Sequence, residues 1–351
     1  MREIILFVCG NIAQIKFSDF ISSECKLNSG IKSALIADIN DNLNIEYIQN
    51  IDYFLKDINL LPGFLKKVRL VVFFNYQSVF ANRKFLHIGI LLKKTNTPFI
   101  SLQHGLIEPG LNFHSDGKII DTVSTSSHTS IGIFHFNKFP ISWDGPSGIG
   151  YPWKQVKSSN LDLLTMKIKI NILVCTNFNW GVYNNEEIYS FIRMINILKI
   201  NYPHFDIRIK PHGSENLINM DLFNYRLKFS DFNFKIFDDK CISESIDWSD
   251  IVITTPSSTI IDSLSAAKPT FIFSTKIFLN NLIKFKKILF NNSDDLNTLI
   301  ISLLRDKKYE WPKLKEFDTK KFLELIDSNS NNNEFKLTEE DYLSFIDKIQ
   351  H

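Results

Sequence analysis

The chain has 351 residues, of which 44% are hydrophobic, and this is enough to bury one large core or two ordinary ones. Two α/β domains are therefore the first expectation. The 40 basic and 38 acidic residues leave a formal net charge of only +2, so no overall positive field indicates a nucleic-acid partner.

The cysteines exclude two further classes of protein. Cys9, Cys25, Cys175 and Cys241 are widely scattered and form no C-x-x-C pair, so neither a zinc site nor a small disulfide scaffold is indicated. Reduced thiols fit a cytoplasmic protein best.

The apolar run from Arg2 to Val8 is too short for a transmembrane span and lacks the cleavage region of a signal peptide. We interpret it as a buried first strand.

Apolar runs alternate with amphipathic stretches along the first half, and four of the runs are predicted strands: residues 4–8, 33–37, 70–74 and 98–102. Strands of a parallel sheet are buried on both faces and read as continuous apolar runs. The stretches Gly145–Pro152 and Lys157–Asn160 interrupt this pattern. We therefore place an N-terminal Rossmann-like domain at residues 1–155.

A second, similar alternation predicts a strand at Ile170–Thr176, a helix at Asn185–Ile200 and strands at Phe205–Lys210 and Ile251–Thr255. The predicted fold is α/β, with two Rossmann-like domains that face each other across a cleft, the second at residues 165–310. Beyond Asn292 the pattern is mostly helical. Residues 311–351 are expected to form a C-terminal helical segment, with a low-complexity hinge at Ser328–Glu334 before a final short helix.

The most informative stretch runs from Ile251 to Phe273 and predicts a strand, a turn of small hydroxyl residues, a helix and a strand. Pro256 stops the first strand, and Ser257, Ser258 and Thr259 open a helix whose first amides have no acceptor within the helix. Such amides and hydroxyls attract an anion. We expect a phosphate cradle here, and an ordinary strand-to-helix turn with a serine N-cap is the alternative.

A second chemical constellation lies in Ile207–Gly213. The predicted strand delivers Lys210, His212 and Gly213 to the carboxyl end of the sheet, where doubly wound folds bind their ligands. A cation and an imidazole beside the serine turn would neutralise a diphosphate or a phosphodiester leaving group, and Gly213 would permit close approach of the backbone. The alternative is a polar exit turn.

In the first half of the chain, a predicted strand within Pro98–Glu108 also ends in a His-Gly pair. An imidazole near neutral pH can accept a proton from an acceptor hydroxyl, so His104 is a candidate base. Glu108 is a second candidate base or an orienting partner. His114, Asp116 and His128 follow in the same half, and for each of them a place in a surface loop is the favoured interpretation.

Three motifs together resemble a known family: Gln103-His104-Gly105, Lys210-Pro211-His212, and Pro256-Ser257-Ser258-Thr259 with Asp262. Over most of its length the chain looks like the GT-B glycosyltransferases of bacterial surface polysaccharides. It is most similar to the capsule and lipopolysaccharide enzymes that use CMP-activated sialic acid or Kdo, and to the related teichoic acid polymerases that transfer glycerol phosphate from CDP-glycerol. Gly213 stands where those families usually have proline.

This resemblance implies a metal-independent transferase with no cofactor, which moves a sugar from a nucleotide-activated donor, preferably a CMP-sugar, to a glycan or lipid-linked glycan acceptor in capsule or lipopolysaccharide synthesis. The second domain would hold the donor nucleotide. Asp262 would hold the serine loop or a ribose, and Glu244 would contact the nucleoside. The chain has no D-x-D triplet, the carboxylate pair that binds a metal diphosphate in GT-A enzymes, so no metal is expected.

One basic and aromatic stretch bears on location. Residues 63–94 contain seven basic and no acidic residues, interleaved with several phenylalanines. Such a stretch can rest on an anionic inner leaflet, which would bring a cytoplasmic enzyme to lipid-linked acceptors at the inner face of the plasma membrane. The alternative is that the aromatic side chains fill the core and the lysines are solvated.

Three other functions remain open. The first is a CDP-glycerol-type glycerophosphotransferase. The second is an isomerase similar to the UDP-sugar 2-epimerases, which share the two-domain architecture and a serine-bearing phosphate loop but would be expected to have a richer set of carboxylates. The third is a non-catalytic protein of the same fold that binds sugar nucleotides.

Overall fold

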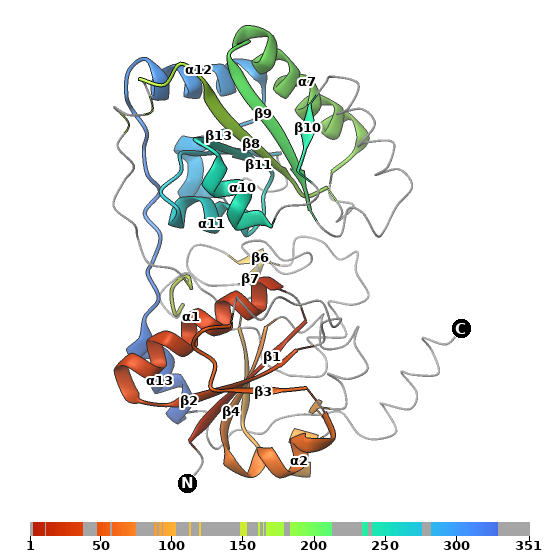
Figure 1. The fold of residues 1–351 in the computed structure, drawn as a ribbon, viewed down its shortest axis with the longest axis vertical. Helices are drawn as coiled ribbons and strands as arrows, with labels where there is room; N and C mark the ends of the chain where they lie inside the picture. Colours follow the sequence, from red (N-terminus) through yellow and green to blue (C-terminus); the bar gives the residue numbers. More distant parts are fainter. Residues whose placement is uncertain are drawn as a thin grey trace, which may run out of the picture. The chain divides into compact units, whose positions relative to one another are not determined.

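The computed structural model divides the chain into two compact units, each built on one parallel sheet (Figure 1). Unit 1 comprises Met1–His104, Glu108–Trp153 and Lys315–His351, and unit 2 comprises Gly105–Ile107 and Lys154–Leu314. The structure describes residues 3–10, 12–37, 48–56, 58–74, 88–89, 91–92, 94–102, 112–113, 119–120, 148–152, 161, 164, 166–178, 183–212, 234–237, 241–275 and 282–328.

The unit 1 sheet has the strand order β3-β2-β1-β4-β5, and every pair in it is parallel. Its strands are β1 (Ile4–Cys9), β2 (Lys32–Ala37), β3 (Tyr53–Leu55), β4 (Val68–Phe74) and β5 (Phe99–Leu102). The four apolar runs of the first half are thus confirmed as strands. Edge strand β3 was not predicted. A separate antiparallel pair joins β6 (Asn112–Phe113) to β7 (Ile119–Ile120).

Both faces of the unit 1 sheet are covered, which explains why its strands are continuously apolar. On one face, Leu6 and Val71 pack with Leu61 of α2 (Leu61–Phe64) and Leu65 of the short helix η3 (Leu65–Lys67), which follows η2 (Ile58–Leu60). On the other face, Phe17 of α1 (Ile12–Ser29) contacts the ring of Phe74, which also stacks on Phe7. Parallel strands buried on both sides need apolar residues at every position.

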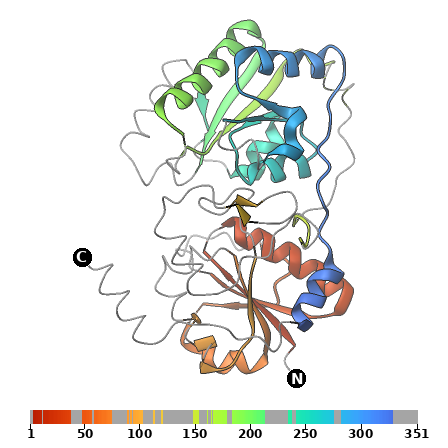
Figure 2. The ribbon, with the colours of Figure 1, turned by 180° about the vertical axis from the view of Figure 1, so that it is seen from behind.

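Unit 1 is completed by the C-terminal part of the described chain. Helix α13 (Thr319–Ser328) packs against α1, and the two helices lie side by side in Figure 1 and in the opposite view of Figure 2. The ring of Phe317 meets that of Phe20, edge to face. The backbone of Lys315 accepts a hydrogen bond of 2.8 Å from the amide of Tyr151.

The described residues after Asn292 are mostly helical, as the pattern predicts, but a non-helical stretch precedes α13. Residues 305–318 form no helix between α12 (Ser293–Leu304) and α13. Pro312 disfavours a helical conformation at Trp311. Lys307 has a φ of +53°, which a right-handed helix does not allow. The predicted hinge and final short helix, from residue 329 onward, lie outside the described residues.

The unit 2 sheet has the order β10-β9-β8-β11-β12-β13, again entirely parallel. Its strands are β8 (Ile170–Thr176), β9 (Phe205–Pro211), β10 (Lys235–Ile236), β11 (Ile251–Thr254), β12 (Thr270–Phe273) and β13 (Leu289–Phe290). The predicted strands in β8, β9, β11 and β12 are confirmed. The two-residue edge strands β10 and β13 were not predicted. The helix predicted at 185–200 is α7 (Asn185–Asn201).

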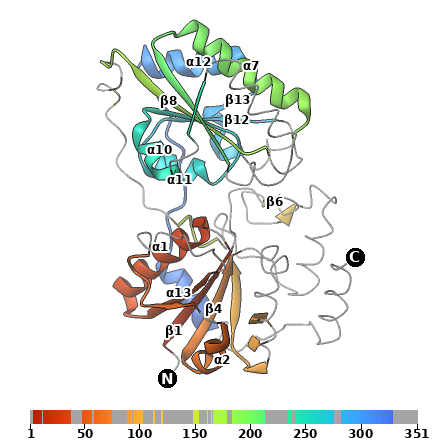
Figure 3. The same cartoon turned by 45° about the vertical axis from the view of Figure 1, so that its right-hand side comes forward.

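Two layers of helices cover the unit 2 sheet, as Figure 3 shows. On one face, α7 and α12 pack together over a cluster of rings in which Phe191 contacts both Phe273 and Phe290. On the other face lie α10 (Ile242–Trp248) and α11 (Thr259–Ser265). Two α/β units with parallel sheets confirm the predicted fold class.

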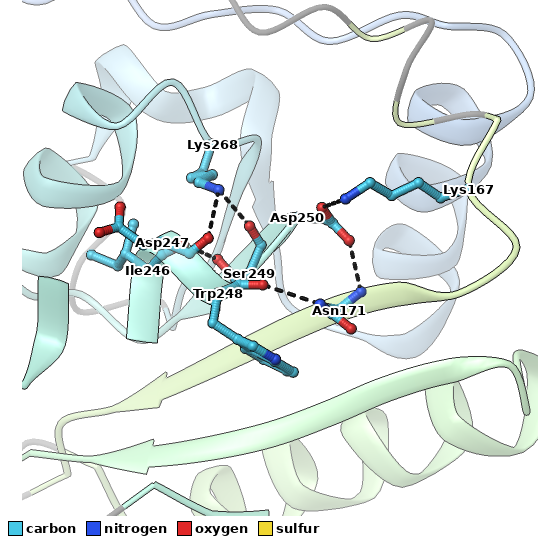
Figure 4. Close-up of polar contacts among 8 residues, drawn as sticks. All are labelled: Lys167, Asn171, Ile246, Asp247, Trp248, Ser249, Asp250 and Lys268. Atoms are coloured by element: carbon cyan, nitrogen blue, oxygen red, sulfur yellow. Dashed lines mark hydrogen bonds and ion pairs between the residues drawn. The ribbon is translucent and has the colours of Figure 1, made fainter. Parts of the chain in front are cut away.

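A polar network fixes the amino-terminal edge of the unit 2 sheet (Figure 4). Asp250 accepts hydrogen bonds from the Asn171 amide at 3.0 Å and from the Lys167 ammonium at 2.5 Å. The Lys268 ammonium donates to the carbonyls of Asp247 and Ser249, at the end of α10. These bonds join the starts of β8 and β11 to the end of α10, at the edge opposite to the strands' carboxyl ends.

The basic and aromatic stretch of the first domain is divided between core and surface. Phe73 and Phe74 are each only 1% exposed, whereas Lys66 and Lys67 are exposed. The described phenylalanines that were considered as membrane contacts thus belong mainly to the core.

None of the described helices combines the length and the apolar character that crossing a bilayer requires. All four cysteines are free thiols.

Candidate functional site

Polar residues follow four neighbouring strands of unit 2 at one edge of the sheet. Because β9, β8, β11 and β12 are parallel and adjacent, their carboxyl ends meet along this edge. It is the edge at which open α/β sheets bind their ligands. Lys210 and His212 lie at the end of β9, and the predicted serine turn follows β11. The structure therefore brings these two constellations to the same edge.

The serine turn has the conformation of an entry into a helix. Ser258 occupies the N-cap of α11 and has no side-chain capping bond. The hydroxyl of Ser257, only 6% exposed, accepts a hydrogen bond of 3.3 Å from the amide of Thr259. No described residue accepts from the amides of Ser257 and Ser258, which precede the helix. The turn therefore presents backbone donors and a hydroxyl toward the carboxyl edge.

Lys210 ties two strands together at this edge. Its half-buried side chain donates a hydrogen bond of 2.8 Å to the carbonyl of Phe237, directly after β10. That bond takes one of the three donors of an ammonium group. His212 is exposed and follows β9 directly. Gly213 lies outside the described residues.

The two predicted carboxylates occupy helix starts. Asp262 lies half-buried in the first turn of α11, four residues after Ser258. Glu244 lies in the first turn of α10, where its carboxylate accepts a hydrogen bond of 3.2 Å from the Cys241 amide. This capping bond gives Glu244 a structural role. Its predicted contact with the nucleoside stays a prediction.

Sequence reasoning missed three buried polar residues at the same edge. Asn177 follows β8 and is 2% exposed, Thr255 follows β11 and is 0% exposed, and Thr275 lies beyond the end of β12 and is 7% exposed. The side-chain oxygens Asn177 Oδ1, Thr255 Oγ1 and Thr275 Oγ1 have no hydrogen-bond partner within the described chain. The signal available in the sequence was a polar residue at the end of each apolar run.

The remaining candidate residues could not be placed. His104 and Glu108 lie outside the described residues, as do His114, Asp116 and His128. Among the residues that are described, no group of three His, Cys, Asp or Glu side chains could hold a metal ion. The chemistry available at the described edge consists of one ammonium, one imidazole, the helix-start amides and several neutral hydroxyl and amide groups.

The comparisons with known proteins concern the fold. No protein-family model matches the sequence, and no curated protein does. Among solved structures, the UDP-GlcNAc 2-epimerase of Neisseria meningitidis bound to UDP-GlcNAc has a TM-score of 0.57 at 14% identity, over 93% of this chain and 100% of that one.

Two further structures agree with it. A putative UDP-N-acetylglucosamine 2-epimerase from Listeria monocytogenes has a TM-score of 0.58 at 9% identity, over 97% of this chain and 99% of that one. The MnaA protein of S. aureus with UDP has a TM-score of 0.57 at 10% identity, over 93% and 96% of the two chains. At such low identity the likeness shows the fold alone. The chain has the GT-B fold.

Proposed function

We propose that the chain is a sugar-nucleotide enzyme whose unit 2 binds the nucleoside diphosphate of an activated sugar. The observation that carries the proposal is the convergence of Lys210, His212 and the Ser257–Thr259 turn on one edge of a parallel sheet. The buried, unpartnered Thr255 directly before this turn supports a ligand there. Ammonium and amide donors are the groups that a diphosphate needs.

A uridine diphosphate sugar is the ligand that we propose first. The similar structures include one bound to UDP-GlcNAc and one with UDP. Their fold extends over nearly the whole of this chain. This support places UDP ahead of the cytidine nucleotide that the sequence resemblance favours.

The reaction that we propose first is epimerisation of a UDP-linked N-acetyl amino sugar, because the similar structures include UDP-GlcNAc 2-epimerases. Sugar transfer is the second candidate. It is supported by the resemblance of the Lys-Pro-His and serine-pair motifs to surface-polysaccharide transferases. In that case His104 or Glu108 would activate the acceptor hydroxyl of a glycan or lipid-linked glycan, with CMP-sugars as alternative donors.

The two reactions differ in what they consume. Epimerisation needs only the nucleotide sugar, whereas transfer needs an acceptor and releases the nucleotide. The purified chain should therefore be incubated with UDP-GlcNAc alone, and the nucleotide sugars separated by ion-exchange chromatography. A new UDP-sugar of unchanged mass supports epimerisation. Release of UDP only after addition of a bacterial glycolipid extract supports transfer, and the same incubation with a CMP-sugar in place of UDP-GlcNAc would release CMP.

Ligand binding tests the proposal independently of the reaction. A nucleotide at about a hundredfold its dissociation constant stabilises a protein by roughly 2.7 kcal/mol, which thermal denaturation detects readily. UDP, UDP-GlcNAc, CDP and CMP should be compared on the native chain and on Ser258→Ala. Ser302→Ala, on the remote helix α12, is the matched control. Stabilisation by none of these nucleotides would contradict the proposal.

A further inference from the structure

The three buried polar groups at the carboxyl edge of unit 2 are a structural anomaly. Buried hydrogen-bonding groups in native proteins nearly always have a partner, since leaving one unpaired costs free energy. Within the described chain, however, Asn177 Oδ1, Thr255 Oγ1 and Thr275 Oγ1 have none. All three lie at the ends of adjacent strands, β8, β11 and β12. Such clustering at a ligand edge points to a molecule that supplies the partners.

The neighbouring threonine shows what a satisfied group looks like. Thr254 is 0% exposed, as is Thr255, but its hydroxyl donates a hydrogen bond of 2.7 Å to the carbonyl of Thr255. Buried Thr270 likewise bonds through its hydroxyl to Ser263. The hydroxyls of Thr254 and Thr270 are therefore paired within the protein, whereas those of Thr255 and Thr275 are not.

The chemistry of the three groups limits what they can bind. They are neutral, and the amide oxygen of Asn177 can only accept a hydrogen bond. An ionised phosphate also offers only acceptors, so it cannot satisfy that oxygen. A ring hydroxyl both donates and accepts. A ring hydroxyl can therefore bond to the side-chain amide of Asn177 whether the oxygen or the nitrogen faces it, and it can also bond to a threonine hydroxyl.

We propose that Asn177, Thr255 and Thr275 form a subsite for a neutral, hydroxyl-bearing ring of the ligand, beside the phosphate-binding turn. This inference rests on the proposed binding of a sugar nucleotide and assigns a part of that ligand to these residues. Two rings of a sugar nucleotide have this chemistry, the ribose and the activated hexose. The hydroxyls of that ring replace the missing partners when the ligand binds.

The unliganded protein gives the first test. Thr255→Val removes a polar atom that has no partner, so the melting temperature of the unliganded chain should rise or stay unchanged. Thr254→Val is the matched control, because it removes a satisfied hydroxyl of the same residue type one position earlier. Its melting temperature should fall by about 2–4 °C. An equal fall in both variants would overturn the proposal, since it would show that the Thr255 hydroxyl already has a partner.

Ligand affinity gives the second test, by titration calorimetry with UDP-GlcNAc, UDP and inorganic pyrophosphate. Thr255→Val, Thr275→Val and Asn177→Leu should each weaken UDP-GlcNAc by about fivefold or more, the equivalent of one buried hydrogen bond. Thr254→Val should bind as the native chain does. A loss for UDP as well identifies the ribose as the bound ring. A loss for UDP-GlcNAc alone identifies the hexose.

The outcomes separate this inference from the proposed function. Equal affinity of all variants for UDP-GlcNAc, or an equal loss for pyrophosphate, would overturn the subsite and leave sugar-nucleotide binding intact. If none of UDP, UDP-GlcNAc, CDP and CMP binds the native chain, the proposed function is wrong. The subsite as a nucleotide-sugar site falls with it, whatever the unliganded melting temperatures are.

Discussion

A Cβ atom on Gly150 would lie 1.9 Å from the carbonyl oxygen of Glu316. The two residues are far apart in the sequence, but the backbone of Tyr151 pairs with that of Glu316 in an isolated bridge. Gly150 also has a φ of +83°, which favours glycine. The attachment of the C-terminal segment to unit 1 therefore requires a residue without a side chain at this position.

Gly150→Ala is expected to destabilise the chain by about 2–5 kcal/mol, because the new methyl group clashes with backbone and the left-handed conformation becomes strained. Urea denaturation followed by circular dichroism measures this. Gly63→Ala is the control, since a Cβ there meets nothing within 4 Å. Gly30→Ala, which has a φ of +67° but open space around it, isolates the conformational part at about 1 kcal/mol. Equal stability of the Gly150 and Gly63 variants would contradict this interpretation.

The stability of unit 1 should depend on pH through Asp52. Burial raises the pKa of this carboxyl, but the hydrogen bonds from the Ser33 amide and the Lys26 ammonium lower it by more than burial raises it. The pKa of Asp52 therefore lies below its ordinary value. A carboxyl with a lowered pKa in the folded state stabilises the protein above its unfolded pKa. This contribution is lost as the pH falls below about 4.

Asp52→Asn should therefore reduce the melting temperature at pH 7 and have a progressively smaller effect as the pH falls below about 4. A series of thermal denaturation curves between pH 7 and pH 3 measures the difference. Asp294→Asn, at an exposed position of α12, provides the reference. A pH-independent difference between native chain and Asp52→Asn would show that the charge of Asp52 plays no part.

We expect Lys268 to stabilise the amino-terminal edge of the unit 2 sheet. Burial lowers the pKa of its ammonium group, which nevertheless donates to the carbonyls of Asp247 and Ser249. Lys268→Met leaves both carbonyls without this donor and should cost about 1–3 kcal/mol in urea denaturation. Lys308→Met, at an exposed position, should stay within about 0.5 kcal/mol of the native chain. A loss of the same size in both variants would argue against a specific role of the ammonium.

The two histidines that flank β9 test which edge of the unit 2 sheet binds the ligand. His212 follows the carboxyl end of the strand, and His204 precedes its amino end. His212→Gln should weaken UDP-GlcNAc by about tenfold if the imidazole helps to neutralise the diphosphate. His204→Gln should leave the affinity unchanged. Titration calorimetry of the native chain and both variants measures these affinities. A larger loss for the His204 variant would place the ligand at the other edge.

The sequence predicts the interior of both sheets well, for a physical reason. Strands β1, β4, β8 and β11 are buried on both faces, so each appears as a continuous apolar run. The edge strands β10 and β13 have only two residues each and leave no such pattern. The non-helical stretch 305–318 was missed although Pro312 marks it in the sequence. Its apolar residues have no strand or helix period, because Tyr309 and Phe317 are held by contacts with the distant Phe271 and Phe20.

The candidate site was predicted in part. Ser257 could be assigned to a strand end because it follows an apolar run, and Lys210 because it ends an alternating strand pattern. Asn177 and Thr275 follow such runs too, but a lone asparagine or threonine is common in loops. What marks them is the combination of burial with a missing partner, and only the structure shows that combination.

The pairing of Tyr151 with Lys315 and Glu316 also sets an order of events during synthesis. Unit 2 is encoded almost entirely between the two parts of unit 1. All of unit 2 therefore emerges from the ribosome before Phe317, whose ring packs against that of Phe20. Until then α1 exposes the apolar surface that α13 later covers. Unit 1 is thus begun before unit 2 and completed after it, and a premature stop after residue 314 would leave unit 1 unfinished.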